Sequence, residues 1–90
     1  MKRRMMFRAG DIVYYKPTGE KWVLACDEER SRVMWLGWPG GVAHASDCQL
    51  VEAASEDERL KTLREVSDIN KLSDFRRIIA QRQLARIEEK

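Results

Sequence analysis

The fold is decided by the stretch GDIVYYKPTGEKWVLACD, residues 10–27, in which two apolar runs flank Pro17-Thr18-Gly19-Glu20. Proline fixes its own φ and glycine accepts a positive φ, so this tetrapeptide predicts a turn with Gly19 in the left-handed region. Apolar runs on both sides of such a turn are typical of a β-hairpin. The first two strands are therefore expected to be antiparallel.

Side-chain alternation assigns faces to these strands, because successive residues of a strand point to opposite sides. Ile12 and Tyr14 are expected on one face of the first strand, with Val13 and Tyr15 on the other. On the returning strand, Trp22, Leu24 and Cys26 are expected to share a core face.

Three further short strands follow. Pro39 cannot donate to a strand ladder and ends the third strand, and Gly40-Gly41 allows a reversal into the fourth. Ser46-Asp47-Cys48 predicts one tight turn, of 3₁₀ type, before the last strand. The five expected strands cover residues 12–16, 21–27, 32–38, 42–45 and 49–51. Five short strands with these connections indicate a mainly β domain of the SH3-like barrel type.

The sequence after Glu52 predicts helix. Ser55 and Glu58 have the spacing of a capping box, and the first turn is acidic. Apolar residues then recur every third position, a period that drifts around an α-helix, so a break is expected between Ser67 and Ser73, with Ser73 capping a second helix to about Glu88. One bent helix remains the alternative. We expect a mainly β plus α chain with a basic arm (1–8), a barrel (9–54) and a helical extension (55–90).

The second helix presents an apparent misfit. Phe75, Ile78 and Ile79 are expected on one face, with Leu84 and Ile87 nearly opposite. Residues 55–70 are therefore expected to pack on the barrel, while residues 73–88 project and bind another chain, either a second copy or a partner protein. Fraying of an exposed tail is the alternative.

Candidate binding residues follow from these patterns. Trp38, beside Pro39 and two glycines, is the aromatic expected at the barrel rim, as a binding residue or as a plug over the open end. The full set expected to bind a protein partner is Trp38, Tyr15, Phe75, Leu84 and Ile87.

Charge is segregated along the chain, although the net charge is only +2. Residues 1–16 carry +4 and residues 71–90 carry +3, whereas the middle is mildly acidic. Basic ends suit phosphate, so binding of nucleic acid is the alternative function. Its expected contacts are Arg3, Arg4, Arg8, Lys16, Arg76 and Arg77.

No pattern in the chain indicates catalysis or a cofactor. The sequence holds one histidine, His44, and neither a phosphate loop nor a nucleophile motif. A metal site of His44, Asp47 and Cys48 with Cys26 lacks paired ligand spacing, and we expect no metal and no cofactor. Two cysteines without a disulfide framework, and no long apolar run, predict a cytoplasmic protein without a membrane span.

The motifs carry a resemblance. Gly10-Asp11-x-Val13-x-x-Lys16-Pro17-Thr18-Gly19-Glu20-x-Trp22, then Trp35-x-Gly37-Trp38-Pro39-x-Gly41 and Asp47-Cys48-x-Leu50, resemble a group of small uncharacterised proteins of phages and prophages in proteobacteria. The resemblance covers roughly residues 7–55 and implies an SH3-like barrel. It implies no activity, and we expect an adaptor that binds a host or phage protein.

Overall fold

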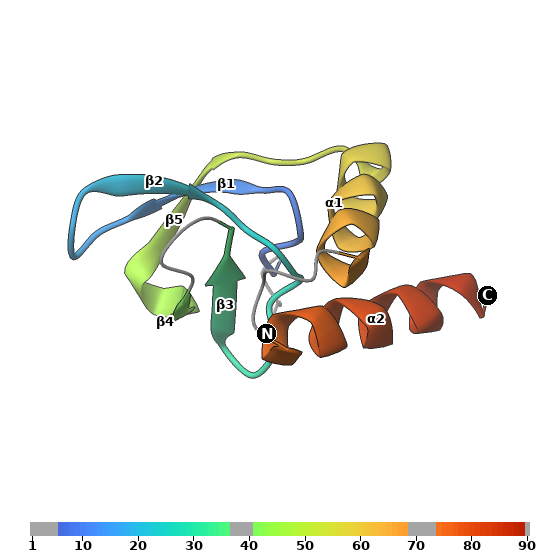
Figure 1. Ribbon diagram of the computed structural model, residues 1–90. Coiled ribbons are helices and arrows are strands. Elements are labelled where there is room, and N and C mark those ends of the chain that lie inside the picture. Colours follow the sequence, from blue (N-terminus) through green and yellow to red (C-terminus); the bar gives the residue numbers. More distant parts are fainter. Residues whose placement is uncertain (1–5, 37–40, 69–73, 90) are drawn as a thin grey trace, which may run out of the picture.

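The fold is described from a computed structural model, which describes residues 6–36, 41–68 and 74–89. Within these ranges the protein is a small α+β chain with five strands in two sheets and two C-terminal helices (Figure 1). The elements are β1 (Ile12–Tyr15), β2 (Glu20–Val23), β3 (Arg32–Trp35), β4 (Gly41–His44), the 3₁₀ helix η1 (Ala45–Asp47), β5 (Cys48–Glu52), α1 (Glu56–Asp68) and α2 (Asp74–Glu88).

The strands form a three-stranded sheet of order β2-β1-β5 and a two-stranded sheet of β3 and β4, all antiparallel. The chain passes from one sheet to the other just after β2. There Leu24 bridges to Trp35, and the Leu36 N–H donates to Val23 O at 2.8 Å. Over the described residues the strands are assigned to two sheets, and no closed ring of strands is seen.

The β1–β2 turn has the predicted conformation. Gly19 has a φ of +78°, and its N–H donates to Tyr15 O at 2.8 Å. The predicted 3₁₀ turn before the last strand is also present as η1, one residue earlier than expected. Both features depend on local residue chemistry, which is why the sequence predicts them well.

Two hydrophobic clusters form the core. One lies between the sheets and contains Val13, Leu24 and Val33. The other joins the helices to the strand connections, with Leu63 and Val66 of α1 packed against Ala25 and Cys26. The expectation that Cys26 shares a core face with Trp22 and Leu24 is wrong, because β2 ends at Val23 and the chain turns toward the helices.

Helix α1 begins as its sequence predicts. The Glu58 N–H donates to Ser55 Oγ at 3.1 Å, and the Ser55 N–H donates to Glu58 Oε1 at 2.9 Å, which completes the capping box. Two helices are present, as predicted, since α1 is Glu56–Asp68 and α2 is Asp74–Glu88; the residues between them lie outside the described ranges. The proposed cap, Ser73, lies outside the described residues.

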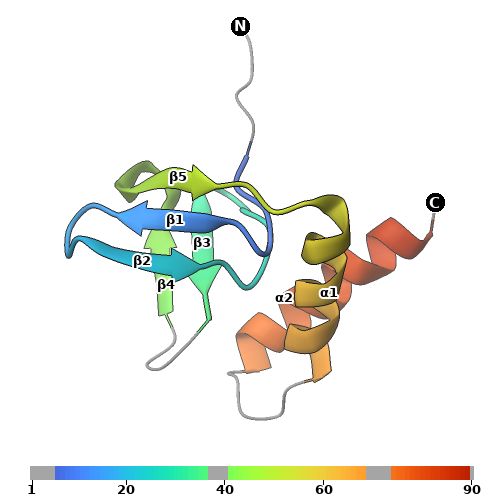
Figure 2. The same cartoon turned by 90° about the horizontal axis from the view of Figure 1, so that it is seen from above.

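The expectation that residues 73–88 project from the domain is wrong. Helix α2 lies beside α1 (Figure 2), and its Ile79, Ala80 and Leu84 are buried in the helix-side cluster, with Ile87 half-buried against it. Phe75 and Ile78 are the large apolar residues of α2 that stay exposed. The buried face of α2 therefore lies between the two groups of apolar residues that were expected on opposite faces, and takes residues from both, Ile79 from one and Leu84 from the other.

Two polar side chains are part of this buried face, so the face cannot be recognised from the spacing of apolar residues in the sequence. Arg76 and Gln83 are both buried on α2. The Arg76 Nη1 donates to Trp35 O at 2.7 Å, and Gln83 bonds to the backbone of Asp27. Because two of its residues are polar, this face has too few apolar residues to be recognised in the sequence as a buried face. In the structure both polar side chains form hydrogen bonds within the chain.

Candidate functional site

The side of the β2-β1-β5 sheet turned away from β3 and β4 carries exposed apolar residues among polar ones, since Lys21 and Gln49 lie opposite Tyr14 in the register. In β1, Val13 is buried and Tyr15 half-buried in the core, so Ile12 and Tyr14 point outward, as the alternation predicts. Residues opposite an outward residue in the register share its face, which places Val23 beside Ile12. An antiparallel sheet with one solvated face normally carries polar residues there.

A bulge adds Val51 to this side of the sheet. Ile12 pairs with Glu52 while Val13 pairs with Leu50, so Val51 is an extra residue of β5. Bulges bend a strand locally and re-aim its side chains. The set of Ile12, Tyr14, Val23 and Val51 is called the outer face below.

The outer face is open to solvent. Tyr14, Val23 and Val51 are 38%, 39% and 48% exposed. Both helices lie at one end of the sheet, and neither crosses this side of the sheet (Figure 2). Neighbouring exposed apolar side chains on one sheet form a patch of the kind that marks contact with another molecule.

On the opposite, inward side of the sheet, three aromatic rings form a stack. The Tyr15 and Trp22 ring centroids are 3.9 Å apart, and those of Trp22 and Trp35 are 3.7 Å apart. All three side chains are half-buried against the inter-sheet cluster. Tyr15, one of the predicted binding residues, therefore packs one face of its ring against Trp22 in the core.

The remaining predicted partner-binding residues are scattered. Leu84 is buried in the chain's own core, and Ile87 packs against that core. Phe75 is exposed at the start of α2. Trp38 lies outside the described residues. The structure does not bring Phe75, Leu84 and Ile87 together with Tyr15 into one surface.

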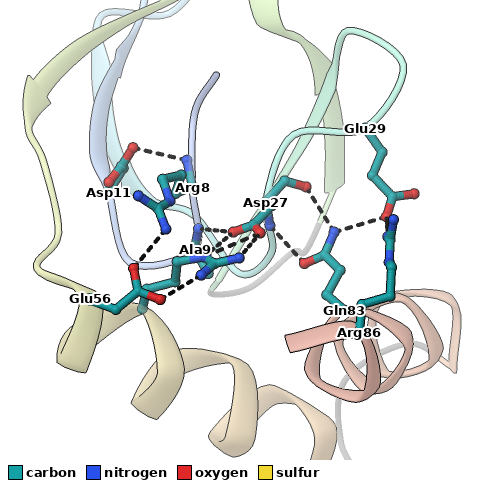
Figure 3. Close-up of polar contacts among 9 residues, drawn as sticks. Arg8, Ala9, Asp11, Asp27, Glu29, Glu56, Gln83 and Arg86 are labelled. Atoms are coloured by element: carbon teal, nitrogen blue, oxygen red, sulfur yellow. Dashed lines mark hydrogen bonds and ion pairs between the residues drawn. The ribbon is translucent and has the colours of Figure 1, made fainter. Parts of the chain in front are cut away.

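A polar network, centred on Asp27, holds the helices to the strand region (Figure 3). Arg59 of α1 donates to both carboxylate oxygens of Asp27, from Nη2 to Oδ2 at 2.6 Å and from Nε to Oδ1 at 3.0 Å. The Ala9 N–H donates to Asp27 Oδ1 at 2.9 Å. This one carboxylate thus joins α1, the β2–β3 connection and the segment before β1.

The ionisation of Asp27 reflects this environment. Burial alone would raise its pKa, but the hydrogen bonds from Arg59 and from the Ala9 N–H outweigh burial, so the pKa of Asp27 is lowered. The same bond raises the pKa of Arg59. The pair is therefore charged at neutral pH, and its charges are matched.

Helix α2 is attached through Gln83. Its Oε1 accepts from the Asp27 N–H at 3.0 Å, while its Nε2 donates to Asp27 O at 3.2 Å and to Glu29 Oε2 at 2.9 Å (Figure 3). Arg82 and Arg86 also pair with Glu29. A single turn of α2 thereby satisfies the backbone of the β2–β3 connection.

Asp11, from the Gly-Asp opening, has a comparable structural role. Its buried carboxylate accepts from the Arg8 N–H at 2.9 Å and from the Ala54 N–H at 2.8 Å. Gly10 has a φ of +87°, and a Cβ there would lie 3.0 Å from Ala54 Cβ. Asp11 thus links the segment before β1 to the segment after β5, and Gly10 allows the close approach of Ala54.

Of the four described basic residues that were expected to bind phosphate, three are engaged within the chain. Arg8 pairs with Glu56 at 2.7 Å, Arg77 pairs with Asp74 at 2.8 Å, and Arg76 is buried against Trp35 O. Lys16 is exposed next to the β1–β2 turn. Arg3 and Arg4 lie outside the described residues.

The two cysteines are far from a shared metal site. Cys26 belongs to the helix-side cluster and Cys48 to the inter-sheet cluster. Burial, aided by Asp27, raises the pKa of Cys26 to about 12, and burial also raises the pKa of Cys48. His44 contributes its backbone oxygen, which lies 3.7 Å from Cys48 Sγ. Across the described residues no group of three possible ligands has metal-binding geometry.

Asp27, Arg59 and Gln83 were not among the residues that the sequence singled out. A carboxylate directly after an apolar strand is the available signal for Asp27, but nothing local points to a partner 32 residues later. Comparisons with protein families, with curated proteins and with solved structures found no match to this chain. None of the helices, within the ranges described, has the length and apolar character to cross a membrane.

Proposed function

We propose that this protein is a non-enzymatic interaction module that binds a partner protein through its outer face. The supporting observation is the group of exposed apolar side chains on the outward side of the β2-β1-β5 sheet, Tyr14, Val23 and Val51, which neither described helix covers. Burying such a patch against a protein recovers hydrophobic free energy at about 25 cal/mol per Å². The surface suits an apolar protein partner.

The proposed scaffold is an SH3-like barrel. The contacts that support it join the two sheets just after β2: Leu24 bridges to Trp35, and the Leu36 N–H donates to Val23 O at 2.8 Å. A 3₁₀ turn between the fourth and fifth strands is consistent with the same topology.

The biological setting is proposed from the motifs. The resemblance of residues 7–55 to phage and prophage proteins favours an adaptor that acts on a host or phage protein. Two free, buried cysteines are compatible with the reducing cytoplasm, where we place this adaptor.

Protein binding is better supported than nucleic-acid binding. Arg8, Arg76 and Arg77 have partners within the chain, so phosphate would have to displace those contacts. Binding of nucleic acid depends on releasing counterions with free basic side chains.

The test is affinity capture from a proteobacterial lysate with and without nuclease, using the wild type and Val23→Lys. Val23 is an exposed outer-face residue, so the charge should abolish capture without unfolding the domain. Ile78→Lys is the matched control, because Ile78 is an exposed apolar residue of α2, away from the outer face.

Support requires a protein that is retained by the wild type and by Ile78→Lys, is lost with Val23→Lys, and is unaffected by nuclease. Loss of all captured protein on nuclease treatment would overturn the proposal in favour of nucleic acid. Equal capture by Val23→Lys and the wild type would show that the outer face is not the site.

A further inference from the structure

Four arginines from two distant parts of the sequence meet at Glu29. Arg82 and Arg86 of α2 both pair with the Glu29 carboxylate, and Arg86 Nη2 lies 3.3 Å from Glu29 Oε2 (Figure 3). Arg32 is opposite Glu29 in the β2–β3 turn, with both backbone hydrogen bonds between them, so the two side chains share a face. Arg30 is exposed directly after Glu29, within the turn itself. These four arginines are called the basic surface below.

The basic surface carries unmatched positive charge. Arg82 and Arg86, which are 53% and 64% exposed, share the single carboxylate of Glu29. Within the described ranges no carboxylate forms an ion pair with Arg30 or Arg32, and both are exposed. Four guanidinium groups against one carboxylate leave three positive charges in excess. The surface therefore suits an anionic ligand.

The other carboxylates of the β2–β3 connection leave this excess in place. Asp27 is matched by its pair with Arg59. Glu28 is directed to the segment before β1, where it accepts from the Phe7 N–H at 3.2 Å. Neither carboxylate pairs with an arginine of the basic surface.

The turn also holds Arg30 in a backbone conformation that arginine rarely adopts. Arg30 and Ser31 have φ values of 55° and 64°, in the left-handed region that glycine accepts most readily. Strain of this kind persists only where the surrounding structure holds it, and it concentrates at functional sites. The strained turn places Arg30 beside Glu29, so this observation points to a binding role independently of the charge.

An exposed aromatic ring lies in line with two of these arginines. Four residues spaced three or four apart follow one another along one side of α2, namely Phe75, Ile78, Arg82 and Arg86. Phe75 and Ile78 are 58% and 54% exposed. At about 1.5 Å of rise per residue, the row from Phe75 to Arg86 is about 16 Å long. One extended ligand can therefore contact the ring and the arginines together.

We propose that the basic surface binds single-stranded nucleic acid, with phosphates on the arginines and a base stacked on Phe75. The planar fork of an arginine matches the oxygens of a phosphate. An exposed aromatic ring beside basic side chains is the combination with which proteins bind single strands without reading their sequence. A protein interface, by contrast, has an apolar core inside a polar rim, and only two apolar residues adjoin these arginines.

The basic surface is separate from the outer face, which belongs to the β2-β1-β5 sheet. It contains none of the basic residues that the sequence singled out. The inference does not rest on the proposed partner protein, because it is tested with the purified chain. A protein held by the outer face should stay captured after nuclease treatment, whether or not the basic surface binds nucleic acid. The two proposals can therefore fail separately.

The test is the fluorescence anisotropy of a labelled single-stranded oligothymidine, titrated with the purified chain. The wild type should bind, and its Kd should rise about 20-fold between about 50 and about 200 mM salt. Each phosphate of a single strand that is neutralised contributes about 0.7 to the salt slope, and about three should be neutralised here. Absence of binding at the lower salt concentration, or a Kd that salt leaves unchanged, would overturn the proposal.

Arg32→Gln tests whether the charge must lie on this surface. It should weaken binding about 5-fold and lower the salt slope by about 0.7. Arg64→Gln is the matched control, because it makes the same change on α1, where Arg64 pairs with Glu88. Glu88 is two residues beyond Arg86 and so lies on the opposite side of α2. Equal losses in the two variants would show that only net charge matters, and the proposal would be wrong.

Two further variants separate binding from folding. Arg30→Asn with Ser31→Gly relieves the strained turn, so it should unfold at a higher urea concentration and yet bind about 5-fold more weakly. Glu29→Gln should tighten binding, because it frees Arg82 and Arg86 for phosphate. Circular dichroism shows whether each variant is folded. A stabilised double variant with wild-type affinity would contradict the proposal, as would weaker binding by folded Glu29→Gln.

Phe75→Ala tests the stacked base. It should raise the Kd about 5-fold or more, because stacking of one base is lost. Ile78→Ala is the control and should change the Kd little, since it removes a neighbouring exposed side chain that has no ring. The corresponding duplex should bind more weakly than the single strand, because its bases are already stacked. Displacement of the oligonucleotide by poly-L-glutamate at equal charge, with no effect of Phe75→Ala, would assign the surface to an acidic protein instead.

Discussion

Asp27 and Arg59 form a two-pronged ion pair, with Arg59 Nη2 2.6 Å from Asp27 Oδ2 and Arg59 Nε 3.0 Å from Asp27 Oδ1. The pair is mostly buried, and it joins the β2–β3 connection to α1. A buried charge costs free energy unless it is paired and hydrogen-bonded, and here both conditions hold. This pair is the main polar link between the helices and the sheets.

Asp27→Asn should lower the free energy of unfolding by about 1–3 kcal/mol at pH 7, because it removes a charge-assisted bond. Since the folded pKa of Asp27 lies below its unfolded value, the stabilisation is fully present above about pH 4 and is lost as pH falls through the folded pKa. Urea unfolding from pH 7 to pH 2 measures this loss. Glu65→Gln, at an exposed position in the middle of α1, is the control and should show the same loss of stability on acidification as the wild type.

Gly10→Ala should destabilise the protein more than Gly19→Ala. Both glycines have positive φ, so each substitution costs about 1 kcal/mol of backbone strain or more. A Cβ at Gly19 meets only the Tyr14 hydroxyl, at 3.7 Å, whereas one at Gly10 crowds Ala54 and Thr62. Thermal melts of the two variants give the order, and equal melting temperatures would contradict it.

The turn between Glu29 and Arg32 should be improvable. Arg30 and Ser31 both have positive φ, at 55° and 64°, in a two-residue turn closed by hydrogen bonds between Glu29 and Arg32. Asn-Gly is the preferred pair for such a turn. The double replacement Arg30→Asn with Ser31→Gly should raise the unfolding free energy by about 0.5–2 kcal/mol, measured by urea titration. A decrease would mean that these side chains make contacts worth more than the strain.

Gly41→Ala should disrupt the aromatic stack. A Cβ at position 41 would overlap the Trp35 ring, so the ring must move away from Trp22. Near-ultraviolet circular dichroism should lose intensity in the tryptophan region, because the Trp35 and Trp22 rings would no longer be held in one fixed, asymmetric arrangement. Gly19→Ala is the control: a Cβ at Gly19 would not contact Trp35, so the tryptophan band should be unchanged.

Cys26 should be unreactive toward thiol reagents in the folded protein. Burial and the nearby Asp27 carboxylate raise its pKa to about 12, so almost none of it is thiolate at neutral pH. Labelling with iodoacetamide, followed by mass spectrometry, should modify Cys26 only after denaturation. Rapid labelling at pH 7 without denaturant would show that the helix-side cluster opens readily.

The sequence by itself determined the local elements of this protein. The β1–β2 hairpin follows from Pro17-Thr18-Gly19 between alternating apolar residues, and the start of α1 follows from Ser55 and Glu58. Each of these depends on residues only a few positions apart. Backbone preference and side-chain capping decide such features within one turn of chain, so they can be predicted without knowing the rest of the fold.

Tertiary structure alone decided how α2 packs and where a binding surface remains. Its buried face includes Arg76 and Gln83. Arg76 can be buried because it donates to Trp35 O, 41 residues away, and Gln83 because it bonds to the backbone of Asp27, 56 residues away. No periodicity reveals a partner at that separation. A polar group is buried only where another segment completes its hydrogen bonds. Once Arg76 and Gln83 are satisfied in this way, α2 packs at one end of the sheet, with Leu84 in the core. The outer face of the sheet is left uncovered.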